Sequence, residues 1–303
     1  MGRDMRQPLR ECRSKLDNVD IISPSRVTGV DVPEKTAGDR AGVTINHQGI
    51  EKKLSARLLV AADGRDSFVR QSLGIKTTDW DYKQTAVIAN ITSQYPHHHV
   101  AYERFTDSGP IAVLPISAGR CAIVWTCAND EVEAIMALDD DAFISAFQQK
   151  FGQRLGKFLK VGVRQAYPLR LVHAREQVRP RLALIGNAAH SLHPIAGQGF
   201  NLGLRDVATL AEIISTARAQ KQDRVDRAVL NDYAIWRKRD HLRVVAFTDG
   251  LVLTFSNNFL PITIARNAGL IASDLMPPVN RLLSRQAMGL SGKLPRLARG
   301  LEL

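Results

Sequence analysis

The chain has 303 residues, of which 45% are hydrophobic and 23% are charged, and its formal net charge is +11. A chain of this length and composition buries a sizeable core in about two domains, which excludes a disordered protein and a small disulfide-stapled one. Its three cysteines lack C-x-x-C spacing, which argues against a disulfide framework and a zinc site. The basic charge suits nucleic acid, an anionic membrane or a solvated surface. Because no nucleic-acid-binding signature accompanies it, we expect no nucleic acid partner.

The first seventy residues predict short elements that end in an apolar strand. We expect a helix over residues 5–16 and strands over residues 19–22, 26–30 and 42–46. The apolar run at residues 58–62 leads into Asp63, Gly64 and Arg65, a tight turn before a helix start that Asp66 or Ser67 can cap.

From about residue 75 to residue 172 the pattern is that of alternating strands. Residues 111–116 and 121–126 flank a Ser-Ala-Gly-Arg turn, which is typical of a hairpin. Cys121 and Cys127 share one side of the second strand and are interpreted as core. Residues 139–151 predict a helix with an acidic start, and residues 161–171 predict a strand. The three histidines at 97–99 follow a Tyr-Pro pair and indicate a loop rather than a metal site.

The most informative segment lies at residues 181–206. An apolar strand at 182–185 ends in Gly186, a glycine-rich turn follows, and residues 200–214 have the spacing of an amphipathic helix with Asp206 and Glu212 on its polar side. A helix N-terminus presents bare N–H groups to an anionic or electron-rich ligand. Gly197, Gly199 and Gly203 would allow a flat ligand to approach the backbone, because no Cβ intervenes.

Residues 193–206 (His-Pro-Ile-Ala-Gly-Gln-Gly-Phe-Asn-Leu-Gly-Leu-Arg-Asp) closely resemble the second flavin-binding motif of the FAD-dependent aromatic hydroxylases, in the version of their ubiquinone-biosynthesis branch. The turn at residues 63–67 resembles the same family's Asp-Gly motif, whose aspartate and backbone contact FAD and help to admit the nicotinamide cofactor. An ordinary strand–turn–helix of an α/β domain is the alternative. The two motifs occur in the family's order, which argues against that alternative.

The resemblance implies a mixed α/β fold with an incomplete Rossmann-like FAD domain, an inserted and mostly antiparallel β-sheet substrate domain, and C-terminal helices. The expected boundaries are residues 1–74 and 173–222 for the FAD domain, 75–172 for the substrate domain and 223–303 for the helical region. This family opens with a G-x-G-x-x-G turn that cradles the pyrophosphate, and the 303 residues contain no such pattern. We therefore expect the chain to correspond to the C-terminal three quarters of such a flavoprotein and to be inactive alone.

The resemblance also implies which residues contact the cofactor. Pro194 would pack beside the flavin ring, and the helix N-terminus after Gly197 would stabilise negative charge at the N1–C2=O edge. Asn187 stands where most relatives carry aspartate and would contact the ribityl chain through its amide. The expected FAD contacts are Asp63, Gly64, Arg65, Gly186, Asn187, Ala188, Pro194, Gly197, Gln198, Gly199, Phe200 and Asn201.

Substrate contacts depend on weaker signals. The candidates are Tyr102, Arg104, Trp125 and His193, and for Trp125 a core position is favoured. No catalytic residue can be named, and no metal site is expected. His190 and His193 lie three positions apart, yet the motif offers no carboxylate or cysteine that completes a ligand set.

In the family that the chain resembles, NADH or NADPH reduces FAD, and O₂ then forms a flavin C4a-hydroperoxide that hydroxylates an electron-rich ring. Asn187, Phe200 and Leu204 are similar to the branch that acts on 2-polyprenyl-6-methoxyphenol, which implies a polyprenyl phenol substrate. Two alternatives remain open. One is a non-catalytic scaffold subunit of a ubiquinone-synthesis complex, and the other is a flavin hydroxylase of a soluble aromatic acid.

The apolar segment at residues 247–278 lies between two basic flanks, at residues 218–243 and from residue 281 onward. Its longest uncharged run, 16 residues, is shorter than the roughly 20 needed to span a bilayer. Interfacial helices between basic patches and helices packed on the flavin domain are both compatible with this pattern. We expect a cytoplasmic protein, with peripheral contact to the inner membrane as the open alternative.

Overall fold

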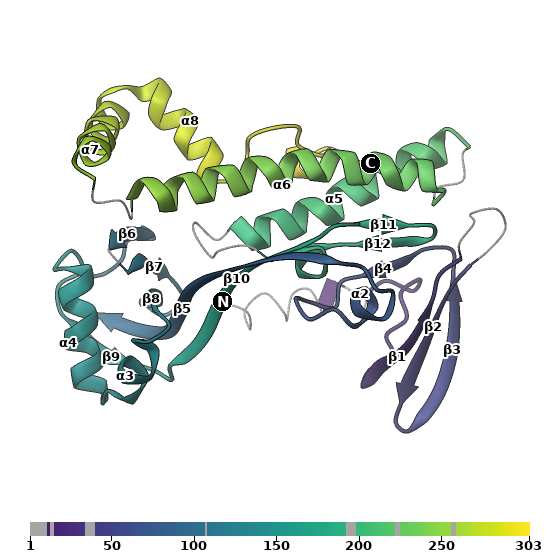
Figure 1. Cartoon of the computed structure of the whole chain (residues 1–303), viewed down its shortest axis with the longest axis horizontal. Helices are drawn as coiled ribbons and strands as arrows, with labels where there is room; N and C mark the ends of the chain where they lie inside the picture. Colours follow the sequence, from purple (N-terminus) through teal and green to yellow (C-terminus); the bar gives the residue numbers. More distant parts are fainter. Residues whose placement is uncertain are drawn as a thin grey trace.

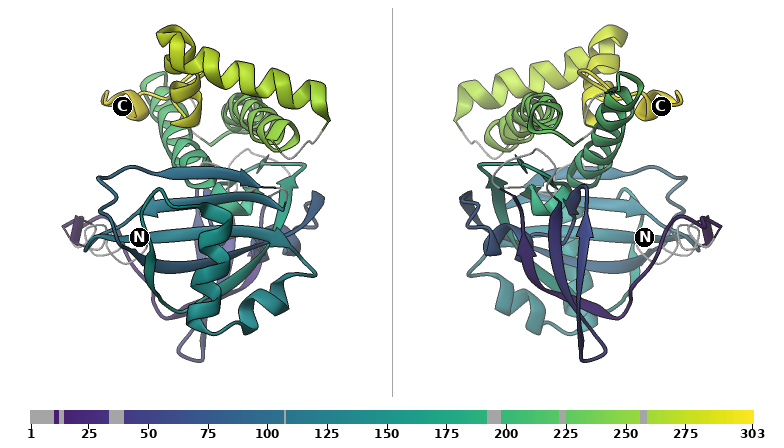
Figure 2. Two further views of the ribbon diagram at one scale, coloured as in Figure 1. Left: turned by 90° about the vertical axis from the view of Figure 1, so that its left-hand side faces the viewer. Right: turned by 90° about the vertical axis from the view of Figure 1, so that its right-hand side faces the viewer.

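The computed structural model of the chain describes residues 11–12, 15–33, 40–106, 108–191, 198–221, 225–255 and 259–303. Three β-sheets form one side of the molecule, and the long helices of the second half lie across them (Figures 1 and 2). This mixture of helices with a large antiparallel sheet confirms the predicted fold class.

The helices and strands follow in this chain order: β1 (Ser25–Asp31), β2 (Ala41–His47), β3 (Ile50–Ala56), β4 (Leu59–Ala61), α2 (Phe68–Ser72), β5 (Thr77–Ser93), β6 (Tyr102–Thr106), β7 (Gly109–Pro115), β8 (Arg120–Ala128), α3 (Val132–Ala137), α4 (Asp140–Phe151), β9 (Phe158–Val161), β10 (Gln165–Ala174), β11 (Val178–Arg179), β12 (Leu182–Leu184), the 3₁₀ turn η1 (Gly186–Ala188), β13 (His190–Ser191), α5 (Gln198–Ala219), α6 (Arg227–Phe255), α7 (Leu260–Leu275), α8 (Pro277–Ala287) and the 3₁₀ turn η3 (Leu297–Arg299).

The largest sheet has the strand order β13-β10-β5-β8-β7-β6, with β9 beside β5, and its pairings are antiparallel. The predicted hairpin is confirmed as β7 and β8. The prediction of one strand over residues 161–171 was wrong, because β9 and β10 pair with different stretches of β5. Between them the Gly162 N–H donates to the carbonyl of Asn90 at 2.8 Å, outside either ladder.

Helix α4 packs on one face of this sheet and closes its core. The helix begins where the acidic signal predicts, since the Asp139 carboxylate accepts the N–H of Ala142 at 2.7 Å. The ring of Trp125 lies 5.4 Å from that of Phe143, centroid to centroid. Cys121 and Cys127 are fully buried here, which confirms their interpretation as core residues. Burial raises the pKa of the Cys127 thiol to about 11, so it stays protonated and unreactive at neutral pH.

A three-stranded sheet is formed by the first strands of the chain. Strands β1, β2 and β3 form an antiparallel meander, which confirms the strands predicted at 26–30 and 42–46. Residues 19–22 form no strand, so that prediction was wrong; Ile21 and Ile22 stay exposed without a ladder to join. Of the helix predicted at 5–16, residues 11–12 are helical and residue 16 is not, and residues 1–10, 13 and 14 lie outside the described residues.

The sheet that positions the candidate site has the order β11-β12-β4, and β4 runs parallel to β12. The strand before the Asp-Gly turn and the strand before Gly186 therefore lie side by side and point the same way. Because parallel strands end at one edge of a sheet, the two motif turns are brought together. Helices α5 and α6 cover this sheet (Figure 1), and the Tyr233 hydroxyl of α6 donates to the carbonyl of Leu184 at 3.1 Å.

In the described part of the chain, no helix is long and apolar enough to cross a membrane. The domain boundaries remain a prediction. The large sheet continues to Ser191 through β13, so strands of the 75–172 block and the following block belong to one sheet.

Candidate cofactor site

The Asp-Gly turn follows β4 and is built as a rigid link into helix α2. Gly64 has a φ of +90°, a conformation that residues with a Cβ rarely adopt. The Asp63 carboxylate accepts the N–H of Val69 at 3.1 Å. The Ser67 hydroxyl caps α2 by accepting the N–H of Arg70 at 3.0 Å, which confirms Ser67 as a cap. The side chain of Asp66 is instead 87% exposed.

Arg70 joins the two motifs. Its side chain is buried, and Nη1 donates to the carbonyl of Ala188 at 2.8 Å while Nη2 donates to the carbonyl of Arg65 at 2.6 Å. One guanidinium therefore fixes the Asp-Gly turn against the 3₁₀ turn η1, which follows it by more than a hundred residues. Nothing in the local sequence around Arg70 predicts this role. Only the pairing of β4 with β12 reveals its partner.

The turn after β12 is held from helix α5. Gly186 has a φ of +55°, and its N–H donates to the carboxylate of Asp206 at 2.7 Å. A Cβ on Gly203 would lie 3.5 Å from the Cα of Gly186, so α5 crosses the turn at van der Waals distance. Asn187 is exposed at the tip of the turn, whereas Ala188 is fully buried. An exposed amide on a fixed turn suits a hydrogen-bonding ligand.

Helix α5 begins at Gln198 beside open space. A Cβ on Gly199 would meet no heavy atom of the described residues within 4 Å, and Phe200 and Leu204 are 59% and 53% exposed. This uncovered helix start fits a flat, electron-rich ring such as a flavin. His193, Pro194 and Gly197 lie outside the described residues, and the side chain of Gln198 is likewise not described.

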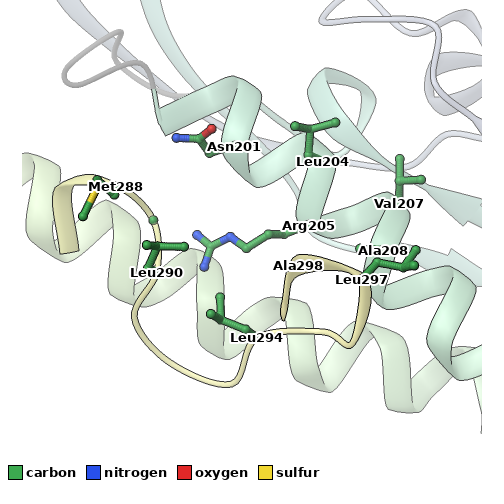
Figure 3. A pocket seen from close by; sticks show the side chains of 11 residues that line it. Asn201, Leu204, Arg205, Val207, Ala208, Met288, Leu290, Leu294, Leu297 and Ala298 are labelled. Atoms are coloured by element: carbon green, nitrogen blue, oxygen red, sulfur yellow. The ribbon is translucent and has the colours of Figure 1, made fainter. Parts of the chain in front are cut away.

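A largely apolar cavity of about 400 Å³ lies along the next turns of α5 (Figure 3). Asn201, Leu204 and Arg205 of the second motif form one wall, and Leu290 and Leu294 of the C-terminal segment form the opposite wall. Arg205 is the one charged residue among those that line the cavity, and its guanidinium pairs with a buried aspartate. The cavity therefore suits a hydrocarbon group better than a phosphate.

A second cavity, of about 300 Å³, borders the Asp-Gly turn and has a different character. Arg65, Arg70 and Arg170 line it together with Asp66 and Asp79. Three arginines against two aspartates give this opening a net positive charge, which favours an anionic ligand.

Three of the proposed substrate contacts lie on the α4 side of the large sheet. The Tyr102 ring packs edge-on against Phe151 with centroids 6.1 Å apart, Arg104 Nη1 donates to the carbonyl of Phe151 at 2.7 Å, and Trp125 is 3% exposed. Trp125 belongs to the buried core and Tyr102 packs against it, which argues against a substrate role for these two residues. Arg104 is exposed and is tied to the last residue of α4. His193, the fourth candidate, is outside the described residues.

The opposite face of the same sheet is the better candidate for a substrate. Strand alternation places Ile88 of β5, Val124 of β8 and Ala112 of β7 in one row, and all three are only partly buried. Phe105 shares this face and stacks on Phe255 of α6 with ring centroids 4.4 Å apart. The alternation in the sequence separates the two faces of the sheet, but it does not show which face α4 covers.

The structure also contains a buried charge network that the sequence analysis missed. Its members come from β13, α5 and α6 and are all less than a tenth exposed: His190, Arg205, Asp206, Arg237, Asp240 and His241. Asp206 is fully buried, which corrects its placement on the polar side of α5. Arg237 and Asp240 fall within the basic flank at residues 218–243, and their partners in α5 are 31 and 35 positions away in sequence.

His190 therefore has the carboxylate partner that its motif was said to lack. Its Nε2 lies 2.7 Å from Oδ2 of Asp206, and Nε2 of His241 lies 3.4 Å from Oδ1. These three side chains could form a ligand set for a metal ion. However, Nε of Arg237 lies 2.5 Å from Oδ1 of Asp206, so a guanidinium already supplies the positive charge there. We interpret the cluster as an ion network.

The ionisation states of the network follow from burial and contacts. Burial acts to raise the pKa of Asp206, but hydrogen bonds from His190 and His241 and the charge of Arg237 outweigh it and hold that pKa well below its usual range. Burial lowers the pKa of His241 to about 3, so its ring is neutral at pH 7. Two aspartates and two arginines then balance one another.

Comparison with known proteins connects this site to a cofactor. The family described as an FAD binding domain matches residues 4–248. "Ubiquinone hydroxylase UbiL" of Rhodospirillum rubrum is 39% identical over 307 residues, covering 100% of this chain and 70% of that protein. "Ubiquinone biosynthesis monooxygenase COQ6, mitochondrial" of Mus musculus is 31% identical, covering 94% of this chain and 66% of that protein.

Solved structures show the same fold. p-Nitrophenol 4-monooxygenase PnpA from Pseudomonas putida superimposes with a TM-score of 0.74 at 20% identity, over 94% of this chain and 71% of that one. OxyS anhydrotetracycline hydroxylase from Streptomyces rimosus superimposes with a TM-score of 0.70 at 20% identity, over 95% of this chain and 56% of that one.

Proposed function

The chain belongs to the FAD binding domain family, and on that premise we propose that it is an FAD-dependent aromatic monooxygenase that hydroxylates a polyprenyl phenol in ubiquinone biosynthesis. One observation carries the cofactor assignment. The two flavin-type turns, far apart in sequence, end parallel neighbouring strands and are joined by the buried guanidinium of Arg70. The ubiquinone hydroxylases among the relatives, at 31–39% identity, support the phenol substrate.

The chain's own residues would hold and orient the flavin. The Gly186 turn and the open start of α5 at Gly199 provide close backbone approach, and Asn187 offers its amide to the ribityl hydroxyls. The N-terminus of α5 would stabilise negative charge on the ring. When bound, FAD reduced by NADH or NADPH supplies the oxygen-activating chemistry.

The reductant and the substrate would use separate surfaces. The cavity lined by Arg65, Arg70 and Arg170 suits the phosphates of a nicotinamide dinucleotide. The open sheet face around Ile88 and Val124 suits an aromatic ring, because it is apolar and partly buried. It would position the ring and exclude water from it.

Helix α7 provides a surface for delivery of a prenylated substrate. Its exposed apolar stripe, which we define as Leu260, Ile264, Ala268, Ile271 and Leu275, repeats at helical spacing, and its four large members are 60–75% exposed. Arg281 and Arg285 are exposed on α8, which follows directly. Apolar side chains beside basic ones are typical of a helix that lies on an anionic membrane, so peripheral membrane contact is part of this proposal.

Vesicle flotation tests the membrane contact. We expect the protein to float with anionic vesicles, and Ile264→Ser with Ile271→Ser to abolish this. Leu242→Ser is the matched control, because Leu242 is 61% exposed on α6 outside the stripe. If the double variant floated as well as Leu242→Ser and wild type, the proposal that the α7 stripe contacts the membrane would be contradicted.

An oxygen-incorporation assay tests the activity. The longest form that the gene encodes is supplied with FAD, NAD(P)H and ¹⁸O₂ and with either a polyprenyl phenol or a soluble aromatic acid. We expect one ¹⁸O atom in the ring of the prenylated product. Labelling of the acid alone would indicate a soluble-acid hydroxylase, and no flavin-dependent labelling of either compound would favour a scaffold role in a ubiquinone-synthesis complex.

A further inference from the structure

We propose that Arg237 of α6 is a positioning residue for the flavin-binding turn and acts through Asp206. The inference rests on the proposed function in one respect, namely that the turn at residues 186–188 contacts the flavin. It assigns to a helix outside both flavin motifs the control of flavin affinity.

Asp206 holds both ends of the flavin-binding turn with one oxygen. Its Oδ2 accepts the N–H of Gly186 at 2.7 Å and lies 2.7 Å from Nε2 of His190. These two groups bracket the segment that carries Asn187 and Ala188. A displacement of this single oxygen would therefore move the whole segment relative to the start of α5.

Arg237 sets the position of that carboxylate from the other side. Its Nε donates to Oδ1 of Asp206 at 2.5 Å, Nη1 donates to Asp240, and Nη2 donates to the carbonyl of Leu202 at 3.3 Å. Nη1 of Arg205 in α5 donates to Oδ1 of Asp240 at 2.8 Å, whereas Arg237 donates to Oδ2. The planar guanidinium of Arg237 is thus held by hydrogen bonds to two residues of α5, Asp206 and Leu202, which fixes its orientation.

Among the described residues, Arg237 is the only arginine or lysine that forms an ion pair with Asp206. Arg237 and Asp206 are both fully buried, and the charges of two arginines and two aspartates cancel. Truncating Arg237 leaves the Asp206 carboxylate with reduced compensation in a site that water does not reach. The carboxylate must then protonate or reorient, and either change weakens its hold on the N–H of Gly186. A ligand site tolerates displacements of only about 0.5 Å.

The same helix offers a matched control. Tyr233 lies one turn before Arg237, is equally buried, and also ties α6 to the strand–turn unit through the carbonyl of Leu184. It does not touch Asp206 through any hydrogen bond recorded among the described residues. Tyr233→Phe therefore removes an α6 anchor while leaving the carboxylate in place.

The test compares Arg237→Met, Arg237→Lys and Tyr233→Phe in the full protein. Amide hydrogen exchange without FAD reports the turn, with Ile185 as the internal reference because its N–H donates to Ala61. We expect Arg237→Met to speed exchange at Gly186 at least tenfold relative to Ile185, and Tyr233→Phe to leave this ratio unchanged. FAD titration should show dissociation constants raised tenfold or more by Arg237→Met and partly restored by Arg237→Lys.

A double variant keeps the inference testable if Arg237→Met does not fold. Asp206→Asn with Arg237→Met removes both charges, so we expect it to fold and still to lose FAD affinity tenfold or more. A folded Arg237→Met or double variant with wild-type FAD affinity would overturn the inference, as would equal effects from Tyr233→Phe. Failure of the wild type to bind FAD would refute the proposed function instead, while the exchange ratio would still report on the network.

Discussion

The same substitution at two glycines of the second motif should weaken FAD binding in both cases but lower protein stability in only one. Gly199 lies in the first turn of α5, has no positive φ, and leaves open space where a Cβ would lie. Valine is a better helix former than glycine by roughly 0.5 kcal/mol, so Gly199→Val should leave the free energy of unfolding unchanged or slightly raised. The added branch would occupy the space assigned to the flavin ring. Overpacking of this kind costs about 1–3 kcal/mol, which corresponds to roughly a 5- to 150-fold weaker FAD affinity.

Gly203 provides the contrast, one helical turn further on. Its Cβ would already lie 3.5 Å from the Cα of Gly186, so the γ-carbons of valine would push α5 away from the turn. Gly203→Val should therefore lower the free energy of unfolding by about 1–3 kcal/mol and weaken FAD binding as well.

Thermal unfolding and FAD titration of both variants, in the longest form that the gene encodes, decide the matter. We expect Gly199→Val to keep the wild-type Tm and lose FAD, and Gly203→Val to lose both. If Gly199→Val bound FAD like wild type, the flavin would not lie at the start of α5. If Gly199→Val lowered the Tm by several degrees, the space beside Gly199 would not be large enough for a side chain.

Two further predictions concern the core and the pH response. Phe147→Ala should lower the free energy of unfolding by about 3–5 kcal/mol in urea titrations, because Phe147 is fully buried between Trp125 and Phe158; a loss below 1 kcal/mol would contradict that packing. The free energy of unfolding should fall as the pH drops below about 6.5, because the pKa of His241 is about 3 in the folded state and ordinary in the unfolded state, so that protons bind the unfolded state preferentially. His241→Gln should flatten this pH dependence down to about pH 4. Below that pH, protonation of Asp206 in the unfolded chain takes over, because the pKa of Asp206 is also lowered in the folded state.

The motif-bearing elements could be predicted because their signals are local. A run such as residues 182–185, ended by a glycine, specifies a buried strand and a turn without reference to other parts of the chain. The same holds for the hairpin of β7 and β8 and for the capped start of α4 at Asp139. The short strand expected at 19–22 failed because a strand needs a partner, and sequence alone does not show whether one exists.

The buried network could not be predicted because its pairing is entirely non-local. Arg237 and Asp240 lie in a charged run that looks like a solvated helix face, and only the packing of α6 on α5 buries them against Asp206. The side of the sheet on which Tyr102 and Arg104 lie could not be predicted for a related reason. Alternation separates Tyr102 and Arg104 from Phe105 correctly, but the side that faces the core depends on where α4 packs.

The central claim is that the protein hydroxylates the ring of a polyprenyl phenol, and deletion of its gene tests this most directly. Quinones extracted from the deletion strain would be identified by mass spectrometry, with a strain that carries the restored gene as the control. The account predicts loss of ubiquinone and accumulation of a prenylated precursor that lacks one ring hydroxyl group. Normal ubiquinone levels without this precursor would contradict it.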